Sequence, residues 1–125
     1  MSTIDAVPSH LFPVGMLQTE PVQVTREPSL DLDDDNKPKT SPHFAGRLPY
    51  RVPVEIPRGY ATKVMRDGKE LRYPVFEDCT VKVWCEKAPA VDVGQYVVFN
   101  QVMVGVIRES GMMYVQALGV RAVES

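Results

Sequence analysis

Hydrophobic and polar residues alternate strictly over residues 80–86, in the second half of the chain. Val81, Val83 and Cys85 fall on one side of this segment, and polar or charged side chains fall on the other. A period of two is typical of a β-strand with one buried face. Trp84 lies on the polar side. It is therefore either exposed on the surface or covered by another part of the chain.

Two further β-rich segments follow toward the C-terminus. Residues 95–107 are rich in Val and aromatic side chains, with Gly105 marking a bend or bulge, and residues 109–111 form a short hairpin connection. Residues 112–123 return as another strand, with a second expected bend at Gly119. Long, bent strands joined by hairpins favour a small barrel, because bulges and glycines supply the curvature that closure needs.

The first half of the chain offers two more strands. Residues 12–24 have a β-rich pattern, but Pro21 confines this segment to a sheet edge or divides it. Residues 47–56 resume the pattern, and the Pro-Arg-Gly sequence at 57–59 is expected to end that strand.

A hairpin is predicted around the Asp67-Gly68 pair, between extended segments at 60–66 and 69–76. Both central residues of such a turn need positive φ, which Asp-Gly pairs provide. The whole pattern predicts an all-β fold, a small five- to six-stranded barrel with hardly any helix.

Between these strands lies an acidic segment without periodicity. Residues 25–46 are dense in Pro, Asp, Ser and Lys, which predicts a long, exposed and partly mobile loop. The acidic run at 31–35 invites comparison with a calcium loop, but Asn36 and Pro42 stand where an EF-hand needs Gly and Glu. A solvated loop is the better interpretation. We therefore expect a loose N-terminus over 1–11 and one domain over 12–125.

Composition limits the classes of function that we expect for this chain. The chain has 125 residues, 44% of them hydrophobic, and no apolar run approaches the roughly 20 residues of a membrane helix. Neither a signal peptide nor a catalytic or cofactor-binding motif is evident, so we expect a cytoplasmic protein that is not an enzyme and has no cofactor or metal. Cys79 and Cys85 lie too far apart along one strand for a disulfide, and we expect both to be small core residues.

Basic and aromatic residues gather in one part of an otherwise acidic chain. The formal net charge is −2, yet residues 44–75 hold seven Arg or Lys against three acids, a net of +4. Single-stranded nucleic acid is held by cations that neutralise phosphates and by flat side chains on which bases stack. The alternative is an ordinary soluble surface. The candidate contact residues are Arg47, Tyr50, Arg51, Arg58, Tyr60, Lys63, Arg66, Lys69, Arg72 and Tyr73, with Lys82 and Trp84 from the adjoining strand.

The order of short motifs from residue 72 to residue 123 resembles a known family. These motifs are Arg72-Tyr73-Pro74-Val75, a strand, an Ala-Pro connector, Val93-Gly94-Gln95-Tyr96-Val97-Val98 and a closing Leu118-Gly119-Val120-Arg121-Ala122-Val123. The pattern is similar to the C-terminal half of the gene V type single-stranded DNA-binding proteins of filamentous phages, and to small proteins of actinobacterial plasmids and phages. The resemblance implies an OB-type barrel that coats single strands during replication or transfer of a phage, plasmid or mobile element, often as a homodimer.

A second hypothesis belongs to a different class. A small β-barrel could act as an adaptor, assembly or inhibitory factor that binds another protein through the acidic run at 31–35. Fold class does not separate the two hypotheses, because small barrels host many functions. DNA and RNA are not distinguished by the sequence either.

Overall fold

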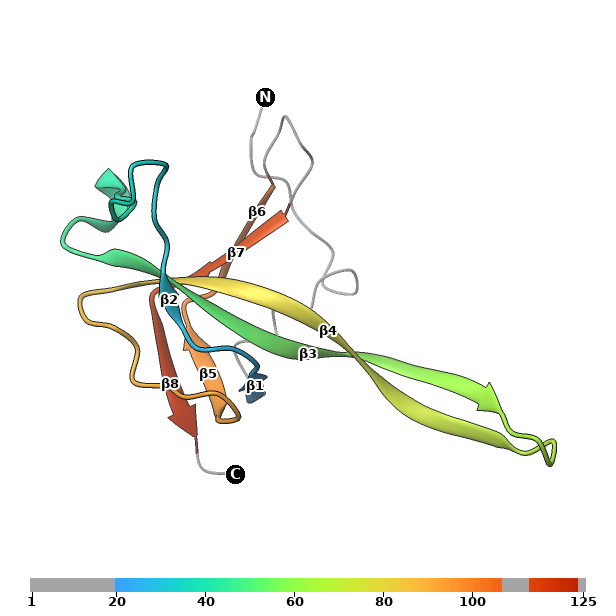
Figure 1. Cartoon of the computed structure of the whole chain (residues 1–125). Coiled ribbons are helices and arrows are strands. Elements are labelled where there is room, and N and C mark those ends of the chain that lie inside the picture. Colours follow the sequence, from blue (N-terminus) through green and yellow to red (C-terminus); the bar gives the residue numbers. More distant parts are fainter. Residues whose placement is uncertain (1–19, 107–112, 124–125) are drawn as a thin grey trace.

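The computed structural model describes residues 20–106 and 113–123 (Figure 1). The predicted all-β class is confirmed: the described residues form eight strands and one short 3₁₀ turn. In chain order these are β1 (Val22–Val24), β2 (Ser29–Leu30), η1 (Pro42–Phe44), β3 (Leu48–Val64), β4 (Glu70–Cys85), β5 (Tyr96–Asn100), β6 (Met103–Val106), β7 (Met113–Ala117) and β8 (Gly119–Val123).

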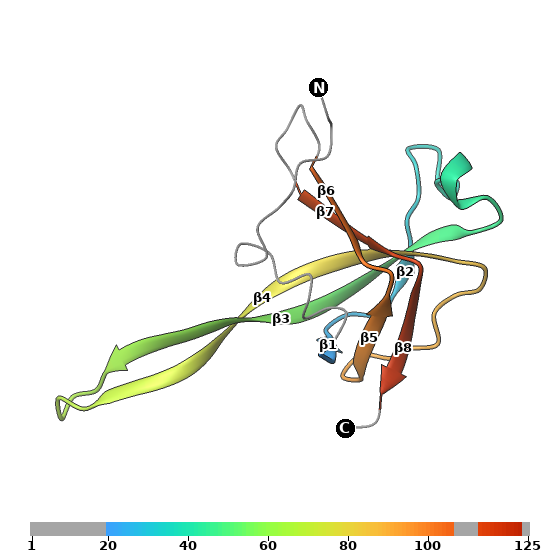
Figure 2. The ribbon, with the colours of Figure 1, turned by 180° about the vertical axis from the view of Figure 1, so that it is seen from behind.

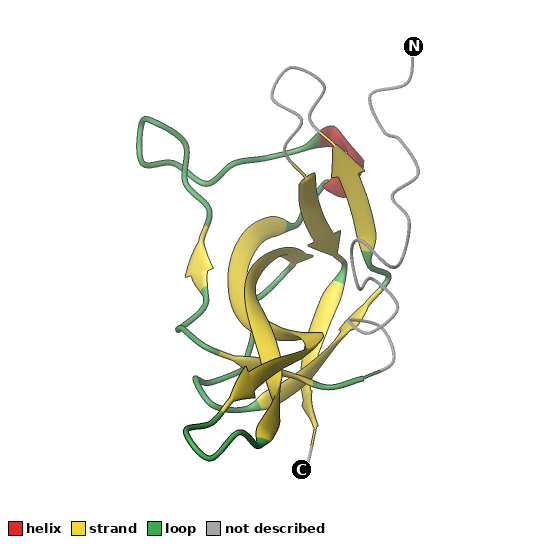
Figure 3. Ribbon diagram, turned by 90° about the vertical axis from the view of Figure 1, so that its right-hand side faces the viewer, coloured by secondary structure: helices red, strands yellow, loops and turns green. Residues whose placement is uncertain are grey.

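The strands form one strongly curved sheet (Figure 3). Its order is β6-β7-β4-β3-β1-β5-β8, with β2 paired to β3, and the pairing of β4 with β7 is parallel. The sheet is not closed. Its two edge strands, β6 and β8, are nevertheless connected by the chain to strands near the opposite edge, because β6 follows β5 directly and β8 follows β7. The arrangement is therefore that of a small, partly open barrel.

The strand count exceeds the predicted five or six because two long predicted strands are each divided and because β2 forms in the segment that was predicted to be a loop. The break between β5 and β6 occurs at Gln101, whose φ of 53° interrupts the extended backbone, and not at Gly105. The break between β7 and β8 occurs at Leu118, one residue before Gly119, and the Leu118 N–H donates to the Asn100 carbonyl at 3.0 Å. The predicted connection at 109–111 and most of the predicted strand at 12–24 lie outside the described residues.

Alternation along the strands builds the core. Val81 and Val83 of β4 are fully buried, as predicted, and pair with Val52 and the partly buried Tyr50 of β3. Cys79 and Cys85 are free thiols that are only partly buried at the edge of this core, so the expectation of full burial is corrected. Burial, with a smaller contribution from Glu77, raises the pKa of Cys79 to about 11. The core cluster consists of Val22, Val24, Val52, Val54, Ile56, Val81, Val83, Val91, Val97, Phe99, Val115 and Ala117.

The β3–β4 hairpin is the longest feature of the molecule. The two strands pair continuously from Leu48↔Cys85 to Val64↔Glu70. The prediction that the Pro-Arg-Gly sequence at 57–59 ends this strand is wrong. The three residues instead form a bulge within β3, in which Gly59 has a φ of 120°. A bulge adds a residue and increases twist without ending the pairing. The predicted hairpin is confirmed, but its turn differs from the expected one: Gly68 has a positive φ, of 83°, whereas Asp67 does not. The Gly68 N–H donates to the Met65 carbonyl at 3.0 Å, and the Met65 N–H donates to the Lys69 carbonyl at 2.7 Å.

Beyond the bulge the hairpin extends away from the other strands (Figures 1 and 2). We call residues 57–78 the arm. Its described side chains are almost all exposed, because no other strand within residues 20–106 and 113–123 pairs with this part of β3 or β4. Within the described structure, both faces of the arm are therefore open.

Residues 25–46 are not the loose loop that was predicted. β2 pairs with β3, Leu32 bridges to Pro38, and η1 follows. Asp31 is largely buried and its carboxylate contacts Lys82 Nζ at 3.0 Å and Lys39 Nζ at 3.5 Å. These backbone pairings and ion pairs give the segment a structure that its composition alone did not predict.

The rest of the acidic run is also used locally. Asp33 Oδ1 accepts hydrogen bonds from the N–H groups of Asp35 and Lys37, at 2.9 and 3.0 Å. Among the described residues, no group of three or more His, Cys, Asp or Glu side chains is placed to hold a metal ion.

We expect replacement of Asp31 by Asn to destabilise the protein at neutral pH and much less in acid. Burial by itself would raise the Asp31 pKa, but the hydrogen bond and charge of Lys82, with the charge of Lys39, lower it below 3.8. A carboxylate with a lowered folded-state pKa contributes stability above its unfolded pKa, and this is lost as pH falls through the folded value. At pH 7 we expect a loss of about 1–3 kcal/mol.

Urea unfolding of the wild type and the Asp31→Asn variant at several pH values between 7 and 2 measures this difference. Asp34→Asn, at an exposed position in the same turn, is the matched control and should change stability little. A deficit in Asp31→Asn that stays constant down to the lowest pH would contradict the assigned role of the Asp31 carboxylate.

Candidate nucleic-acid interface

Strand register divides the arm into an outer and an inner face. Residues directly opposite each other in an antiparallel pair lie on the same face, and successive residues alternate. In β4, Val81 points into the core and Lys82 points outward, so the even-numbered positions continue the outer surface. The outer face carries Tyr60, Thr62, Val64, Glu70, Arg72, Pro74 and Phe76, and the inner face carries Ala61, Lys63, Leu71, Tyr73 and Val75.

The outer face presents an aromatic ring with a cation placed over it. Tyr60 is 65% exposed, and the Cζ atom of Arg72 lies 4.3 Å from the centre of its ring. Tyr60 and Arg72 come from different strands and are diagonal neighbours, since Arg72 pairs with Thr62. A planar guanidinium on an exposed ring offers both charge for a phosphate and a flat surface for a base.

Positive charge is concentrated toward the tip of the arm. Residues 60–72 hold four basic side chains and two acidic ones, so their net charge is 4 − 2 = +2. Arg66 and Lys69 flank the turn and are exposed. Glu77 and Asp78 lie at the base of the arm, near Glu55, so the charge along the arm runs from basic to acidic. Arg58 lies at the bulge, and its side chain is outside the described part of the structure.

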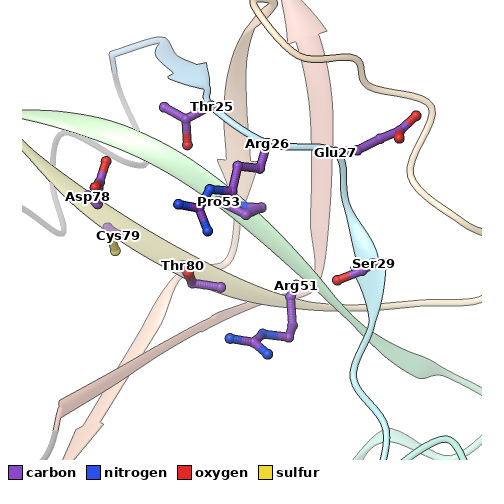
Figure 4. Close-up of a pocket in the computed structure, with 9 residues that line it drawn as sticks. All are labelled: Thr25, Arg26, Glu27, Ser29, Arg51, Pro53, Asp78, Cys79 and Thr80. Carbon is purple, nitrogen blue, oxygen red and sulfur yellow. The ribbon is translucent and has the colours of Figure 1, made fainter.

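A polar groove lies beside the base of the arm, between β3, β4 and the connection from β1 to β2 (Figure 4). It has a volume of about 470 Å³ and is lined by two arginines, Arg26 and Arg51, by two acidic side chains, Glu27 and Asp78, and by three hydroxyl groups. Arg51 was among the predicted contact residues. Arg26 was not, because it stands in the acidic, aperiodic segment and only the fold brings it beside β3.

Trp84 is buried, which decides between the two interpretations that its strand position left open. It is 5% exposed and stacks on Phe44 with ring centres 4.7 Å apart and planes inclined by 19°. Its Nε1 donates to Gln116 Oε1 at 2.7 Å. The segment ending in η1 therefore covers this side of β4. Trp84 is removed from the candidate interface, because a base has no access to its ring.

Two predicted cations are also engaged within the chain. Arg47 is partly buried, and its Nη1 donates to the carbonyls of Trp84 and Leu118, at 3.0 Å each. Lys82 is held by the Asp31 carboxylate. Tyr50 is partly buried where β3 pairs with β2. These side chains stabilise the junction of the barrel with segment 25–46, a role that sequence alone did not indicate.

The remaining predicted residues do not all lie on one surface. Tyr60 and Arg72 share the outer face, Arg66 and Lys69 lie at the turn, and Arg51 continues the outer surface beside Lys82. Lys63 and Tyr73 lie on the inner face. A single nucleic-acid strand that follows the outer face would therefore not reach Lys63 or Tyr73.

Comparison with known proteins adds no further constraint. No protein-family model matches the chain, and none of the curated proteins compared with it matches. Within residues 20–106 and 113–123, the structure contains no helix with the length and apolar character needed to cross a bilayer.

Proposed function

We propose that this protein binds single-stranded nucleic acid without sequence specificity, through the outer face and turn of the arm and the groove at its base. The observation that carries the proposal is the Arg72 guanidinium stacked on the exposed Tyr60 ring of a projecting hairpin. Backbone-tracking cations and stacking aromatics are the usual means of binding single strands without reading their sequence.

The path of the nucleic-acid strand follows from the positions of the cations that form no ion pair with another described residue. Arg66 and Lys69 at the turn, Arg72 on the outer face, and Arg51 with Arg26 in the groove form a discontinuous line along one side of the hairpin. Tyr60 lies within this line and offers its ring to a base. The partly open barrel agrees with this assignment, since OB-type barrels bind oligonucleotides on the corresponding pair of strands.

The resemblance to gene V type proteins supports a role in replication or transfer of a phage, plasmid or mobile element. In this proposal the protein acts in the cytoplasm, coats single strands and performs no catalytic step. The adaptor hypothesis has less support, because Asp31 and Asp33 of the acidic run already make contacts within the chain: Asp31 with Lys82 and Lys39, and Asp33 with the backbone of its own turn.

Fluorescence anisotropy with labelled oligo-dT, and with a duplex of equal length, tests the proposal. If Arg26, Arg51, Arg66, Lys69 and Arg72 each neutralise one phosphate, the logarithmic salt slope on a single strand should be about −3.5. Affinity should then fall about 130-fold between roughly 50 and 200 mM salt. We expect single strands to bind more tightly than duplex at both salt concentrations.

Undetectable binding at the lower salt concentration, or equal affinity for duplex and single strand, would contradict the proposal. A matched oligo-U titration distinguishes DNA from RNA preference, since a 2′-hydroxyl is the chemical difference that a protein can recognise.

A further inference from the structure

Phe76 is a second exposed aromatic residue on the outer face of the arm, and it was not among the predicted contact residues. Its side chain is 49% exposed, and it pairs with Pro57 at the barrel end of the arm. Tyr60 pairs with Pro74, so Phe76 is its diagonal neighbour on the side of the barrel. Arg72 is the corresponding diagonal neighbour on the side of the tip. The two strands therefore place a cation on one side of Tyr60 and a second ring on the other.

The two faces of the Tyr60 ring have different surroundings. Arg72 comes from the row nearer the tip, and its Cζ atom lies 4.3 Å from the centre of the ring. The guanidinium therefore covers the ring face that is turned toward the tip. Within residues 20–106 and 113–123, Tyr60 and Phe76 make no ring contact with each other, and Tyr60 remains 65% exposed. The ring face turned toward Phe76 is therefore open.

The spacing of Tyr60 and Phe76 suits a flat molecule between them. Diagonal neighbours across an antiparallel pair are about 7–8 Å apart. Bases stack at a spacing of about 3.4 Å, so a base with a ring on each side needs the two rings about 7 Å apart. Pro74 lies on the same face between the two rows, and its short side chain leaves the space above it open.

We propose that Tyr60 and Phe76 form a slot that holds one unpaired base of a single strand between their rings. This inference rests on the proposed binding of single strands and identifies the ligand of this part of the surface as a nucleobase. A base within a duplex cannot enter, because it would first have to leave its stack and its pair. The slot therefore supplies a preference for single strands, which phosphate contacts by themselves do not give.

The acidic residues beside the slot agree with this orientation of the base. Glu55 and Asp78 pair with each other on the outer face, one row nearer the barrel than Phe76. Two carboxylates at this position repel phosphates. A base that inserts edge-on between the rings holds its sugar and phosphate away from the sheet. A strand lying flat on the outer face would instead bring its phosphates against both carboxylates.

Ring size predicts which bases the slot prefers. The slot contacts the faces of a base and not its edges, and every base has such faces, so it tolerates all sequences. A purine overlaps both walls with two fused rings, whereas a pyrimidine has one. We therefore expect an adenine in the slot to bind about two- to fivefold more tightly than a thymine.

Fluorescence anisotropy with two labelled oligonucleotides of equal length tests the inference. One is entirely abasic, and the other carries a single central adenine, so both offer the same phosphates. For the wild type, we expect the adenine to increase affinity at least about tenfold. Phe76→Ala and Tyr60→Ala should each weaken binding of the adenine-bearing strand at least about fivefold. Phe76→Ala should leave the affinity for the abasic strand unchanged.

A strand with a single base also separates one shared slot from two independent stacking surfaces. If Tyr60 and Phe76 each stacked a base of their own, the adenine would move to the ring that remains. Either substitution would then cost little affinity. In the slot both rings contact the same base, so removal of either one is felt.

Val75→Ala is the matched control. Val75 precedes Phe76 in β4 but lies on the inner face, and its replacement should change binding of neither strand. Phe76→Leu keeps an apolar side chain without a flat ring, and it should lose as much affinity as Phe76→Ala. Phe76→Trp keeps a flat ring and should retain the wild-type affinity. Phe76 lies outside the core cluster, so circular dichroism and the melting temperature should stay unchanged in these variants.

Wild-type affinity of Phe76→Ala or Phe76→Leu for the adenine-bearing strand would overturn the inference. An equal loss on the abasic strand would also overturn it, because the base would then not be the ligand. In either case, binding of oligo-dT by the wild type would still support the proposed function. A wild type that binds neither oligo-dT nor these two strands would contradict the proposed function, and the slot with it. If Phe76→Ala unfolds, Phe76→Leu decides the question, because it keeps most of the side-chain volume.

Discussion

Replacing Trp84 with Ala is expected to destabilise the protein by about 3–5 kcal/mol, the usual cost of removing a buried Trp or Phe side chain. Trp84 is 5% exposed, stacks on Phe44 and donates a hydrogen bond to Gln116. The change leaves a cavity between η1 and β4 and also leaves the Gln116 amide oxygen without this donor. A loss of this size should lower the melting temperature by about 10 °C or more.

Urea unfolding followed by far-ultraviolet circular dichroism measures this effect, since Trp84 is the single Trp of the chain and fluorescence is lost with it. Tyr60→Ala is the matched control, because that ring is 65% exposed and its removal should change stability by at most about 0.5 kcal/mol. Equal stabilities of the two variants would show that segment 25–46 does not cover β4 in solution. The wild-type emission spectrum should also be that of a Trp shielded from water.

The second large effect concerns binding of single strands by Tyr60→Ala and Arg66→Ala. Loss of the Tyr60 ring removes a stacking surface, which should cost about 1–3 kcal/mol of affinity for oligo-dT. The salt slope should stay nearly constant, because stacking releases no counterions. Arg66→Ala should instead make the logarithmic slope shallower by about 0.7, the contribution of one phosphate contact on a single strand.

Anisotropy titrations at three or more salt concentrations separate these two behaviours. Lys87→Ala is the control, because Lys87 is exposed in the connector between β4 and β5, away from the arm. A Tyr60→Ala variant with wild-type affinity, or an Arg66→Ala slope equal to that of the wild type, would remove the corresponding residue from the interface. Trp84→Ala should affect binding only as far as it unfolds the protein.

Local patterns predicted the secondary structure of the β3–β4 hairpin well. The alternation at 80–86 and the Asp67-Gly68 turn are both properties of neighbouring residues, and the turn sets the register of the strands on either side. That register places Tyr60 and Arg72 on one face of the hairpin and Lys63 and Tyr73 on the other. Composition then indicated the part of the chain where basic and aromatic residues gather.

The role of segment 25–46 was not predictable from local pattern. Its β2 pairing depends on Tyr50 and Arg51, and its ion pair depends on Lys82, residues that are remote in sequence. A polar, Pro-rich composition predicts little apolar burial, which is a statement about the segment alone. The composition of the segment contains no information on the pairing residues and counter-charges that another strand supplies.

Of the candidate site, the sequence by itself determined the chemistry: an extended hairpin with Arg, Lys and Tyr side chains and a turn near the Asp67-Gly68 pair. Tertiary structure decided which of those side chains are available. It buried Trp84 under Phe44, engaged Arg47 and Lys82, and brought Arg26 beside Arg51. The physical reason is that strand alternation follows from steric rules between neighbouring residues, whereas exposure depends on which distant segment packs against each face.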